Sequence, residues 1–268
     1  MGELVFIGLG LYDENDMSLR GLKEAETADF VFAEFYTSLM AGLSLERLEE
    51  RIGKKVIIVT RKTLEEDNGE PILQKAENMK VAFLVPGDPL IATTHVDLRI
   101  RAQKRGIKTL VVHGVSIVSA VMGLSGLQNY RFGRSVTVPF LENGLVSETP
   151  YNVIAENKAR DLHTLCFLDI KAEKKQYMTV KEALEILLAL EKKRKMHVVT
   201  LDSVAVGLAK AGAGDAVVKA DKIKALLSFE FGSPPHVLVF PAPRLHFVEA
   251  EALINLAGAP EQVNKLVG

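Results

Sequence analysis

The chain has 268 residues, of which 48% are hydrophobic and 25% are charged, and its formal net charge is -1. This length is enough for one large domain or two modest domains, each with its own core. A protein that lives on nucleic acid usually carries a clustered basic excess, which is missing here, so we expect a small molecule or another protein as the partner and no direct nucleic acid.

The first half of the chain alternates short β-rich runs with segments of helical spacing. The expected strands are residues 4–10, 29–34, 55–59, 80–85 and 108–113. The expected helices between them are residues 18–28, 43–52 and 95–106. This alternation predicts a mostly parallel sheet with helices on its faces.

After His113 the β-rich runs follow one another more directly. The expected strands are residues 134–139, 162–170, 196–201, 203–209, 215–220 and 236–242, and the clearest amphipathic helix is residues 179–195. No helix separates residues 196–201, 203–209 and 215–220, so we expect them to pair antiparallel in a mixed sheet. The fold class is therefore α/β, with two domains at residues 1–113 and 114–268 that abut across a cleft.

Three short parts of the sequence bear on the cellular compartment and on whether the chain crosses a membrane. The start MGELVFIGLG lacks the basic flank and cleavage pattern of a signal peptide, so the cytoplasm is expected. The single cysteine, Cys166, excludes an internal disulfide and is expected to be a small buried hydrophobe. Residues 109–127 are uncharged, but their glycines, serines and His113 divide them into a strand and a buried helix, so no membrane segment is expected.

Asp88 stands at the carboxyl end of a buried strand in the stretch VAFLVPGDPLIATTH, residues 81–95. In open α/β sheets this edge lines the crevice in which ligands bind. Asp88 and Pro89 also make a good N-cap and N1 pair, so the turn has a purely structural explanation as well.

Gly8 and Gly10 end the first strand and permit close approach of the backbone to a ligand or a neighbouring helix. They do not make a dinucleotide fingerprint, because residues 12–15 intervene before the helix that starts near Ser18. The sequence has no phosphate loop, no paired histidines at metal spacing and no G-x-S-x-G elbow. Hydrolase, kinase and metalloenzyme functions therefore lack support, and no metal is expected.

Several other small or polar residues lie at the ends of strands, each with a structural explanation of its own, as caps, turns or rigid edges. Those that follow a strand are Glu34, Tyr36, Thr37, Ser38, Ser116, Ala211 and Gly212, whereas Pro234, Pro235 and His236 enter the strand at residues 236–242. If two domains face each other across these ends, the weak signals share one cleft.

Five long segments resemble the diphthine synthases, a family in the tetrapyrrole-methylase-like class of S-adenosylmethionine methyltransferases. They are FIGLGLYDENDMSLRGL, FAEFYTSLMAG, FLVPGDPLIATTHVDLRIRA, LHTLCFLDIKAEKKQYM and GSPPHVLVFPAPRLHFVEAEAL, in order over nearly the whole chain. The absence of a long insertion or extra tail is similar to the archaeal form. Gly114 and Val115 depart from the pattern of the family, which concerns the shape of that loop.

The resemblance implies a homodimer of two-domain subunits that bind S-adenosylmethionine in the cleft between domains and release S-adenosylhomocysteine. It assigns no catalytic residue and no metal. The implied cofactor-binding residues are Leu11, Asp88, Ile91, Ser116, Ile117, Leu168, Ala211 and His236.

The implied reaction is trimethylation of the amino group of the 3-amino-3-carboxypropyl-modified histidine of translation elongation factor 2, which gives diphthine in diphthamide biosynthesis. Lys171, Lys174 and Lys175 are candidates to bind the carboxylate of this substrate, although such lysines are usually a solvated face. The alternatives are a methyltransferase of a tetrapyrrole or corrin precursor, with the same fold, and a nonenzymatic nucleotide-binding regulator.

Overall fold

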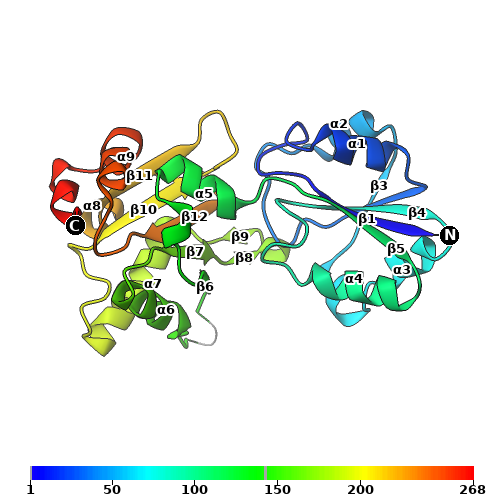
Figure 1. Ribbon diagram of the computed structural model, residues 1–268. Coiled ribbons are helices and arrows are strands. Elements are labelled where there is room, and N and C mark those ends of the chain that lie inside the picture. Colours follow the sequence, from blue (N-terminus) through cyan, green and yellow to red (C-terminus); the bar gives the residue numbers. More distant parts are fainter. Residues whose placement is uncertain (1, 142–143) are drawn as a thin grey trace. The chain divides into compact units, whose positions relative to one another are not determined.

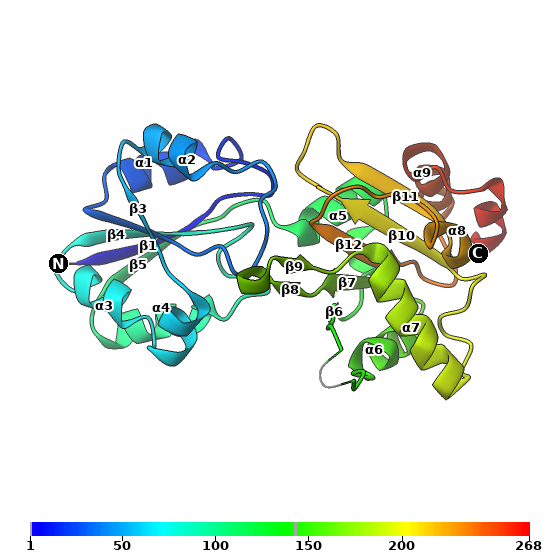
Figure 2. The same ribbon diagram turned by 180° about the vertical axis from the view of Figure 1, so that it is seen from behind.

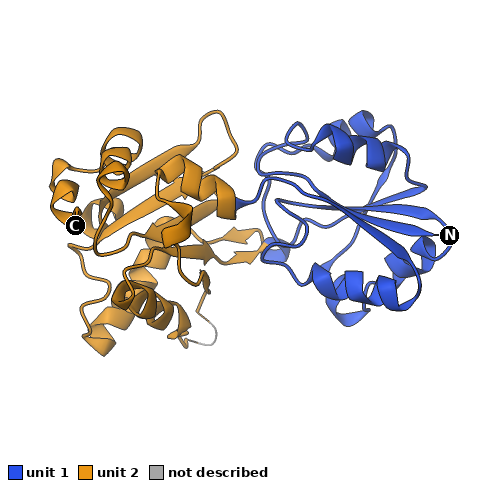
Figure 3. Cartoon of the chain, viewed as in Figure 1, with its two compact units in different colours: residues 1–117, 172–174 blue, residues 118–171, 175–268 orange. Residues whose placement is uncertain are grey.

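The computed structural model describes residues 2–141 and 144–268, which form two compact units (Figure 3). Unit 1 comprises the chain up to Ile117 together with Ala172–Lys174, and unit 2 comprises Val118–Lys171 and Lys175–Gly268. The units are groups of mutually contacting residues. The boundary expected after residue 113 concerns domains and stays a prediction.

Unit 1 is a parallel five-stranded sheet with helices on both faces (Figure 1), which confirms the expected parallel α/β arrangement. Its strand order is β3-β2-β4-β1-β5. The strands are β1 (Glu3–Gly8), β2 (Phe30–Ala33), β3 (Val56–Ile58), β4 (Lys80–Val85) and β5 (Lys108–Val112). The helical segments are α1 (Leu19–Glu26), α2 (Leu45–Ile52), η1 (Lys62–Glu66), α3 (Glu70–Ala76) and α4 (His95–Lys104).

The side chains of β1 feed two separate cores because successive residues of a strand point to opposite faces. Leu4 and Phe6 pack with the buried residues of α3 and α4. Val5 and Ile7 pack with those of α1 and α2. The near-continuous apolar character of β1 is therefore that of a strand buried on both faces.

The connections that leave β1 and β4 run in opposite directions along the sheet. In the order β3-β2-β4-β1-β5, the chain passes from β1 across β4 to β2, whereas it passes from β4 across β1 to β5. Neighbouring strands with diverging connections form a topological switch point, and ligands of open α/β sheets bind outside the carboxyl ends of such strands. The loops after β1 and β4 lie at this point.

Unit 2 contains a mixed five-stranded sheet in the order β11-β10-β12-β7-β6, in which only β6 and β7 pair parallel. The strands are β6 (Val136–Val138), β7 (Thr164–Leu168), β10 (Val204–Ala209), β11 (Val217–Lys222) and β12 (His236–Phe240). A short hairpin consists of β8 (Ile170–Lys171) and β9 (Gln176–Tyr177), joined by η3 (Ala172–Lys174). The expected mixed sheet is confirmed.

Helices α6 and α7 lie together in unit 2, as the reverse view shows (Figure 2). Buried side chains of α6, α7 and α8 share one core with the sheet. The helical segments are α5 (Ile117–Ser125), η2 (Asn129–Arg131), α6 (Thr149–Ala159), α7 (Val180–Arg194), α8 (Ile223–Leu226), α9 (Phe247–Ala257) and η4 (Glu261–Leu266). The expected helix at residues 179–195 is confirmed as α7.

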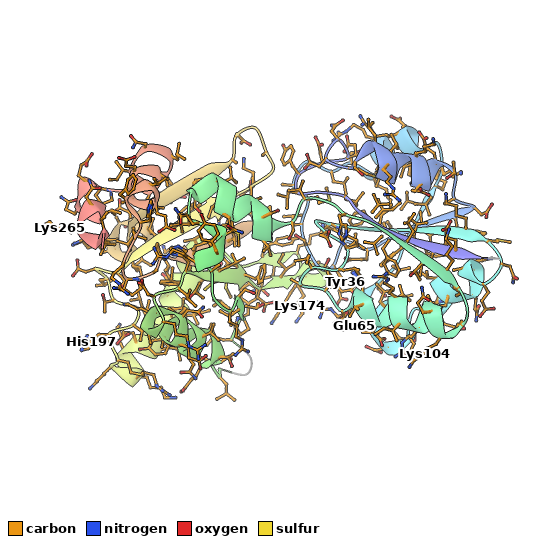
Figure 4. The ribbon with its side chains drawn as sticks, in the orientation of Figure 1. Tyr36, Glu65, Lys104, Lys174, His197 and Lys265 are labelled. Atoms are coloured by element: carbon orange, nitrogen blue, oxygen red, sulfur yellow. The ribbon has the colours of Figure 1, made fainter. Side chains whose placement is uncertain are left out.

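The strand expected at residues 196–201 is wrong. The backbone N–H groups of His197, Val198 and Val199 donate to the side-chain carboxylate of Glu191 over 2.8, 2.8 and 2.9 Å. Three consecutive donors on one carboxylate cannot also form a strand ladder, so the segment is irregular and the exposed His197 lies at its start (Figure 4). Residues 204–209 and 217–222 do pair antiparallel.

The helix expected after Gly114 is present as α5, but it is not buried. Val121 and Ser125 are its buried residues, whereas Ser119 and Gly123, one helical turn apart, are exposed. A helix with an exposed face lies at the surface, and its apolar composition does not make it a core helix. Within the described residues, no helix has the length and apolarity that a membrane span needs.

Candidate functional site

Three glycines bring the loops at the switch point of unit 1 into backbone contact. A Cβ atom on Gly8 would lie 2.4 Å from the nitrogen of Gly114 and 2.5 Å from the oxygen of Gly87. A Cβ on Gly114 would lie 2.3 Å from the same Gly87 oxygen. Gly10 and Gly87 also pair with each other through two backbone hydrogen bonds, of 3.2 and 2.6 Å. The carboxyl ends of β1, β4 and β5 therefore form a single tight edge.

Asp88 lies at this edge and is almost fully buried, with 6% exposure. Its Oδ1 atom accepts the N–H of Leu90 over 3.0 Å, and its Oδ2 atom lies 2.7 Å from Nδ1 of His113. The expectation that Asp88 and Pro89 cap a helix is wrong, because α4 begins only at His95. The bond from Asp88 to the backbone two residues on is an Asx turn, which holds the carboxylate in place without a helix.

The other site residues predicted for the amino-terminal half lie around the same edge. Leu11 follows the β1 glycine turn, and its N–H donates to Asp16 over 3.1 Å. Ile91 is in the Asp88 loop with 47% of its side chain exposed. Ser116 and Ile117 lie between β5 and the first turn of α5, both partly buried. The strand-end rule thus places five predicted residues of unit 1 on one edge, and their contact with a ligand stays a prediction.

His113 is the member of this group that the sequence pattern did not single out. Its side chain is 75% exposed, yet its Nδ1 atom bonds to the buried carboxylate of Asp88. The available signal was its position directly after β5, at the same edge of the sheet as the end of β4. The scattered spacing of the histidines in the sequence concealed this contact.

The three predicted residues of unit 2 also lie on one edge of their sheet. Leu168 is the last residue of β7, and His236 is the first residue of β12, which pairs antiparallel with β7. Ala209 pairs with His236, and the loop of Ala211 begins directly after it. The structure therefore brings Leu168, Ala211 and His236 together within unit 2.

Both ring nitrogens of His236 are used inside unit 2. Nδ1 accepts the N–H of Val180 over 3.3 Å, and Nε2 donates to the carbonyl of Gly232 over 3.1 Å. Burial lowers the pKa of His236 although the bonds to Gly232 and Ser233 oppose this shift. The lowered pKa favours the neutral imidazole, and contact of His236 with a ligand stays a prediction.

The candidate lysines differ in their surroundings. Lys171 is partly buried, and its ammonium lies 5.4 Å from the centre of the Phe140 ring. Lys174, labelled in Figure 4, and Lys175 are exposed. Their role toward a substrate carboxylate stays a prediction. Cys166 is fully buried, and burial raises the pKa of its thiol, which confirms the expected inert hydrophobe.

No cluster of three or more histidine, cysteine or acidic residues suited to a metal ion occurs in the described part of the chain. What the edges offer is a buried carboxylate, close backbone contacts and small or apolar side chains. These features suit an uncharged or cationic organic ligand that donates hydrogen bonds.

The sequence matches the tetrapyrrole (corrin/porphyrin) methylase family over residues 3–202. It is similar to the diphthine synthase of Methanocella arvoryzae, with 51% identity over 95% of this chain and 98% of that protein. It is equally similar to the diphthine synthase of Methanococcoides burtonii, with 51% identity over 97% of this chain and 98% of that protein. A crystal structure of a diphthine synthase superposes with a TM-score of 0.91 and 43% identity, covering 99% of this chain and 100% of the other.

Proposed function

Because the chain belongs to the tetrapyrrole (corrin/porphyrin) methylases and, within them, to the diphthine synthases, we propose that it trimethylates the modified histidine of translation elongation factor 2. The chain is an S-adenosylmethionine-dependent methyltransferase of diphthamide biosynthesis. The observation that carries this assignment is 51% identity to a diphthine synthase over 95% of the chain. The acceptor proposed is the amino nitrogen of the 3-amino-3-carboxypropyl group, and the product is diphthine.

Methyl transfer to an amine depends mainly on alignment. S-adenosylmethionine supplies a methyl group on a sulfonium, whose positive charge disperses as the carbon–sulfur bond breaks. The protein contributes by holding the amine in line with that methyl group, which accounts for most of the acceleration. The amine must be unprotonated to attack, and an apolar surrounding favours that form. Such a reaction needs no cluster of catalytic side chains, which agrees with the residues found at the two sheet edges.

We propose that the two edge groups contact the cofactor. Unit 1 contributes Leu11, Asp88, Ile91, Ser116 and Ile117, and unit 2 contributes Leu168, Ala211 and His236. The support is the position of the unit 1 residues beyond the carboxyl ends of parallel strands, the position of the unit 2 residues on one edge of their sheet, and the family resemblance. The product of the reaction, S-adenosylhomocysteine, binds to the same residues.

Asp88 fits a ligand that carries an ammonium group and ribose hydroxyls. Its carboxylate accepts one hydrogen bond on each oxygen, from Leu90 and from His113. A carboxylate has about four acceptor positions, so it retains capacity for donors of the ligand. Because Asp88 is already fixed by two bonds, little conformational freedom is lost when the ligand binds.

The protein substrate requires a binding surface of its own. We propose that Lys171, Lys174 and Lys175 attract the carboxylate of the modified histidine, since that group needs a cationic partner. We further propose a homodimer, which the family resemblance supports, and a cytoplasmic location, which suits a free and fully buried Cys166.

Mass spectrometry of elongation factor 2 tests the proposal directly. The factor that carries the 3-amino-3-carboxypropyl group is incubated with the protein and S-adenosylmethionine, and the modified peptide is weighed. We expect a mass increase of three methyl groups on the modified histidine. Methylation of a corrin precursor instead would favour the other branch of the fold, and binding without transfer to either acceptor would favour a regulator.

A further inference from the structure

His95, the first residue of α4, is held in one protonation form by Pro89. Its Nδ1 atom lies 3.2 Å from the carbonyl oxygen of Pro89, and the residue is only 2% exposed. A carbonyl oxygen only accepts hydrogen bonds, so Nδ1 carries a proton and Nε2 of the neutral ring presents a lone pair. Nε2 is buried and finds no hydrogen-bond partner among residues 2–141 and 144–268.

This Nε2 atom faces the carboxyl group of Glu34, at the end of β2. The Oε1 atom of Glu34 lies 3.8 Å from Nε2, and both side chains are shielded from solvent. The other oxygen of Glu34 accepts the N–H groups of Tyr36 and Thr37 over 2.9 and 3.0 Å, and the Thr37 hydroxyl bonds to Oε1. An ionised carboxylate opposite an unprotonated nitrogen would leave a buried acceptor unpaired against a buried charge. One of the two groups must therefore carry a further proton.

Burial places that proton on Glu34. It raises the pKa of Glu34, although the hydrogen bonds that this carboxyl accepts and the positive charge of Arg61 oppose the shift. Burial also lowers the pKa of His95 to about 4, although the bond to Pro89 opposes it. The ring of Phe83 packs edge to face against the imidazole, with the ring centres 5.2 Å apart, and offers it no hydrogen bond in place of water. Both shifts favour a neutral carboxyl beside a neutral imidazole.

The Pro89 carbonyl belongs to the loop that carries Asp88 and Ile91. Residues 86–94 contain neither a helix nor a ladder strand, so few backbone bonds hold them. The Thr93 hydroxyl also donates to the Pro89 oxygen, over 3.0 Å, so this carbonyl accepts two hydrogen bonds. Ala92 has a φ of 55°, a conformation that persists only where its surroundings enforce it.

We propose that a protonated Glu34 and a neutral His95 act as a positioning pair for the loop that presents Asp88 and Ile91. Neither residue touches the reacting atoms, and His95 acts on the loop through the Pro89 carbonyl. The effect on cofactor affinity rests on the proposed function, whereas the protonation of the pair and the order of the loop do not.

Long-range proton–nitrogen NMR spectra of histidine-labelled protein test the protonation state of His95. We expect His95 to show a protonated Nδ1 and an unprotonated Nε2 at neutral pH. We also expect this pattern to persist below the ordinary histidine pKa of 6.5, because burial lowers the pKa of this imidazole to about 4. An imidazolium signal at neutral pH, or a proton on Nε2, would overturn the proposal.

A matched pair of variants at His95 tests the contact with Pro89. Asparagine places an amide donor where Nδ1 stands, whereas glutamine places the same group one carbon further, near Nε2. We expect His95→Asn to keep the affinity for S-adenosylhomocysteine and the hydrogen-exchange protection of the Leu90 amide within about threefold. We expect His95→Gln to lose about tenfold or more of both, the equivalent of one hydrogen bond. Equal losses in both variants would refute positioning through Pro89.

Glu34→Gln tests where the proton lies. Its amide can accept the same backbone bonds and donate toward Nε2, so it copies a protonated Glu34 and should keep the affinity and the loop protection within about threefold. A loss of about tenfold or more would refute a protonated Glu34. If the unaltered protein fails to bind S-adenosylhomocysteine, the proposed function fails, while the NMR and exchange results still decide on the pair.

Discussion

Replacing Asp88 by asparagine should weaken cofactor binding far more than it weakens folding. Asparagine keeps the shape and an oxygen to accept the N–H of Leu90, but it removes the charge and one acceptor atom. The lost bond to His113 costs little stability, about 0.5–1 kcal/mol, because that imidazole is 75% exposed and turns to water. A charge-assisted bond to the ligand contributes about 1.5–3 kcal/mol, so the dissociation constant should rise about ten- to a hundredfold.

Calorimetric titration with S-adenosylhomocysteine measures this change, and urea unfolding without ligand measures the cost to folding. Asp29→Asn is the matched control, since Asp29 also accepts a backbone N–H, from Lys80 over 2.8 Å, but precedes β2 at the opposite edge of the sheet. The control should bind as the unaltered protein does. An unchanged affinity in Asp88→Asn, or an equal loss in both variants, would refute the reasoning.

Three further predictions concern stability. Glu191→Ala should lower the free energy of unfolding by about 2–4 kcal/mol in urea titration, because the backbone N–H groups of residues 197–199 lose their acceptor. The control Glu185→Ala, at an exposed position on the same helix, should change this free energy little, and equal effects would contradict the role of Glu191. Gly114→Ala should lower the free energy of unfolding by about 1–3 kcal/mol, since its Cβ would meet the Gly87 oxygen. Gly123→Ala, in open space on α5, should leave the melting temperature unchanged or raise it, and the reverse order of the two variants would disprove the close packing. Acid should destabilise unit 2 through His163 and Glu249, whose side chains bond over 2.9 Å. Burial lowers the pKa of His163, so the free energy of unfolding falls as the pH drops below 6.5. The pKa of Glu249 is also lowered, because its hydrogen bonds outweigh burial, so further stability is lost below pH 4.5. Urea titrations at several pH values should show a smaller loss below pH 4.5 in Glu249→Gln than in the exposed control Glu261→Gln, and identical pH profiles would exclude Glu249 as a source.

Local pattern was enough to predict the strands of unit 1 and the position of Asp88 at a strand end, because both depend on residues close in sequence. The missed features depend on partners far away or on unusual chemistry. The contact between Asp88 and His113 arises because β4 and β5 flank β1, an order that periodicity does not reveal. The helix α9 was missed because a histidine, His246, caps it in place of the usual small polar residue.

The same distinction explains the error at residues 196–201. Their apolar and β-branched residues are typical of a strand, and Val198 and Val199 are indeed buried. The backbone conformation of this segment is set by a carboxylate on the preceding helix, and the pattern of the segment alone does not reveal that contact. The edge of unit 2 that carries Leu168, Ala211 and His236 was within reach of the sequence because these residues lie at or next to strand ends.

The central position of β1 has a consequence for synthesis on the ribosome. This strand emerges first, yet Glu3 pairs with Lys80 on one side and with Lys108 on the other. Until both partners have left the exit tunnel, a largely apolar strand has two unpaired edges, which invites aggregation. The nascent chain thus depends on shielding, such as that of a chaperone, until about residue 113 is free.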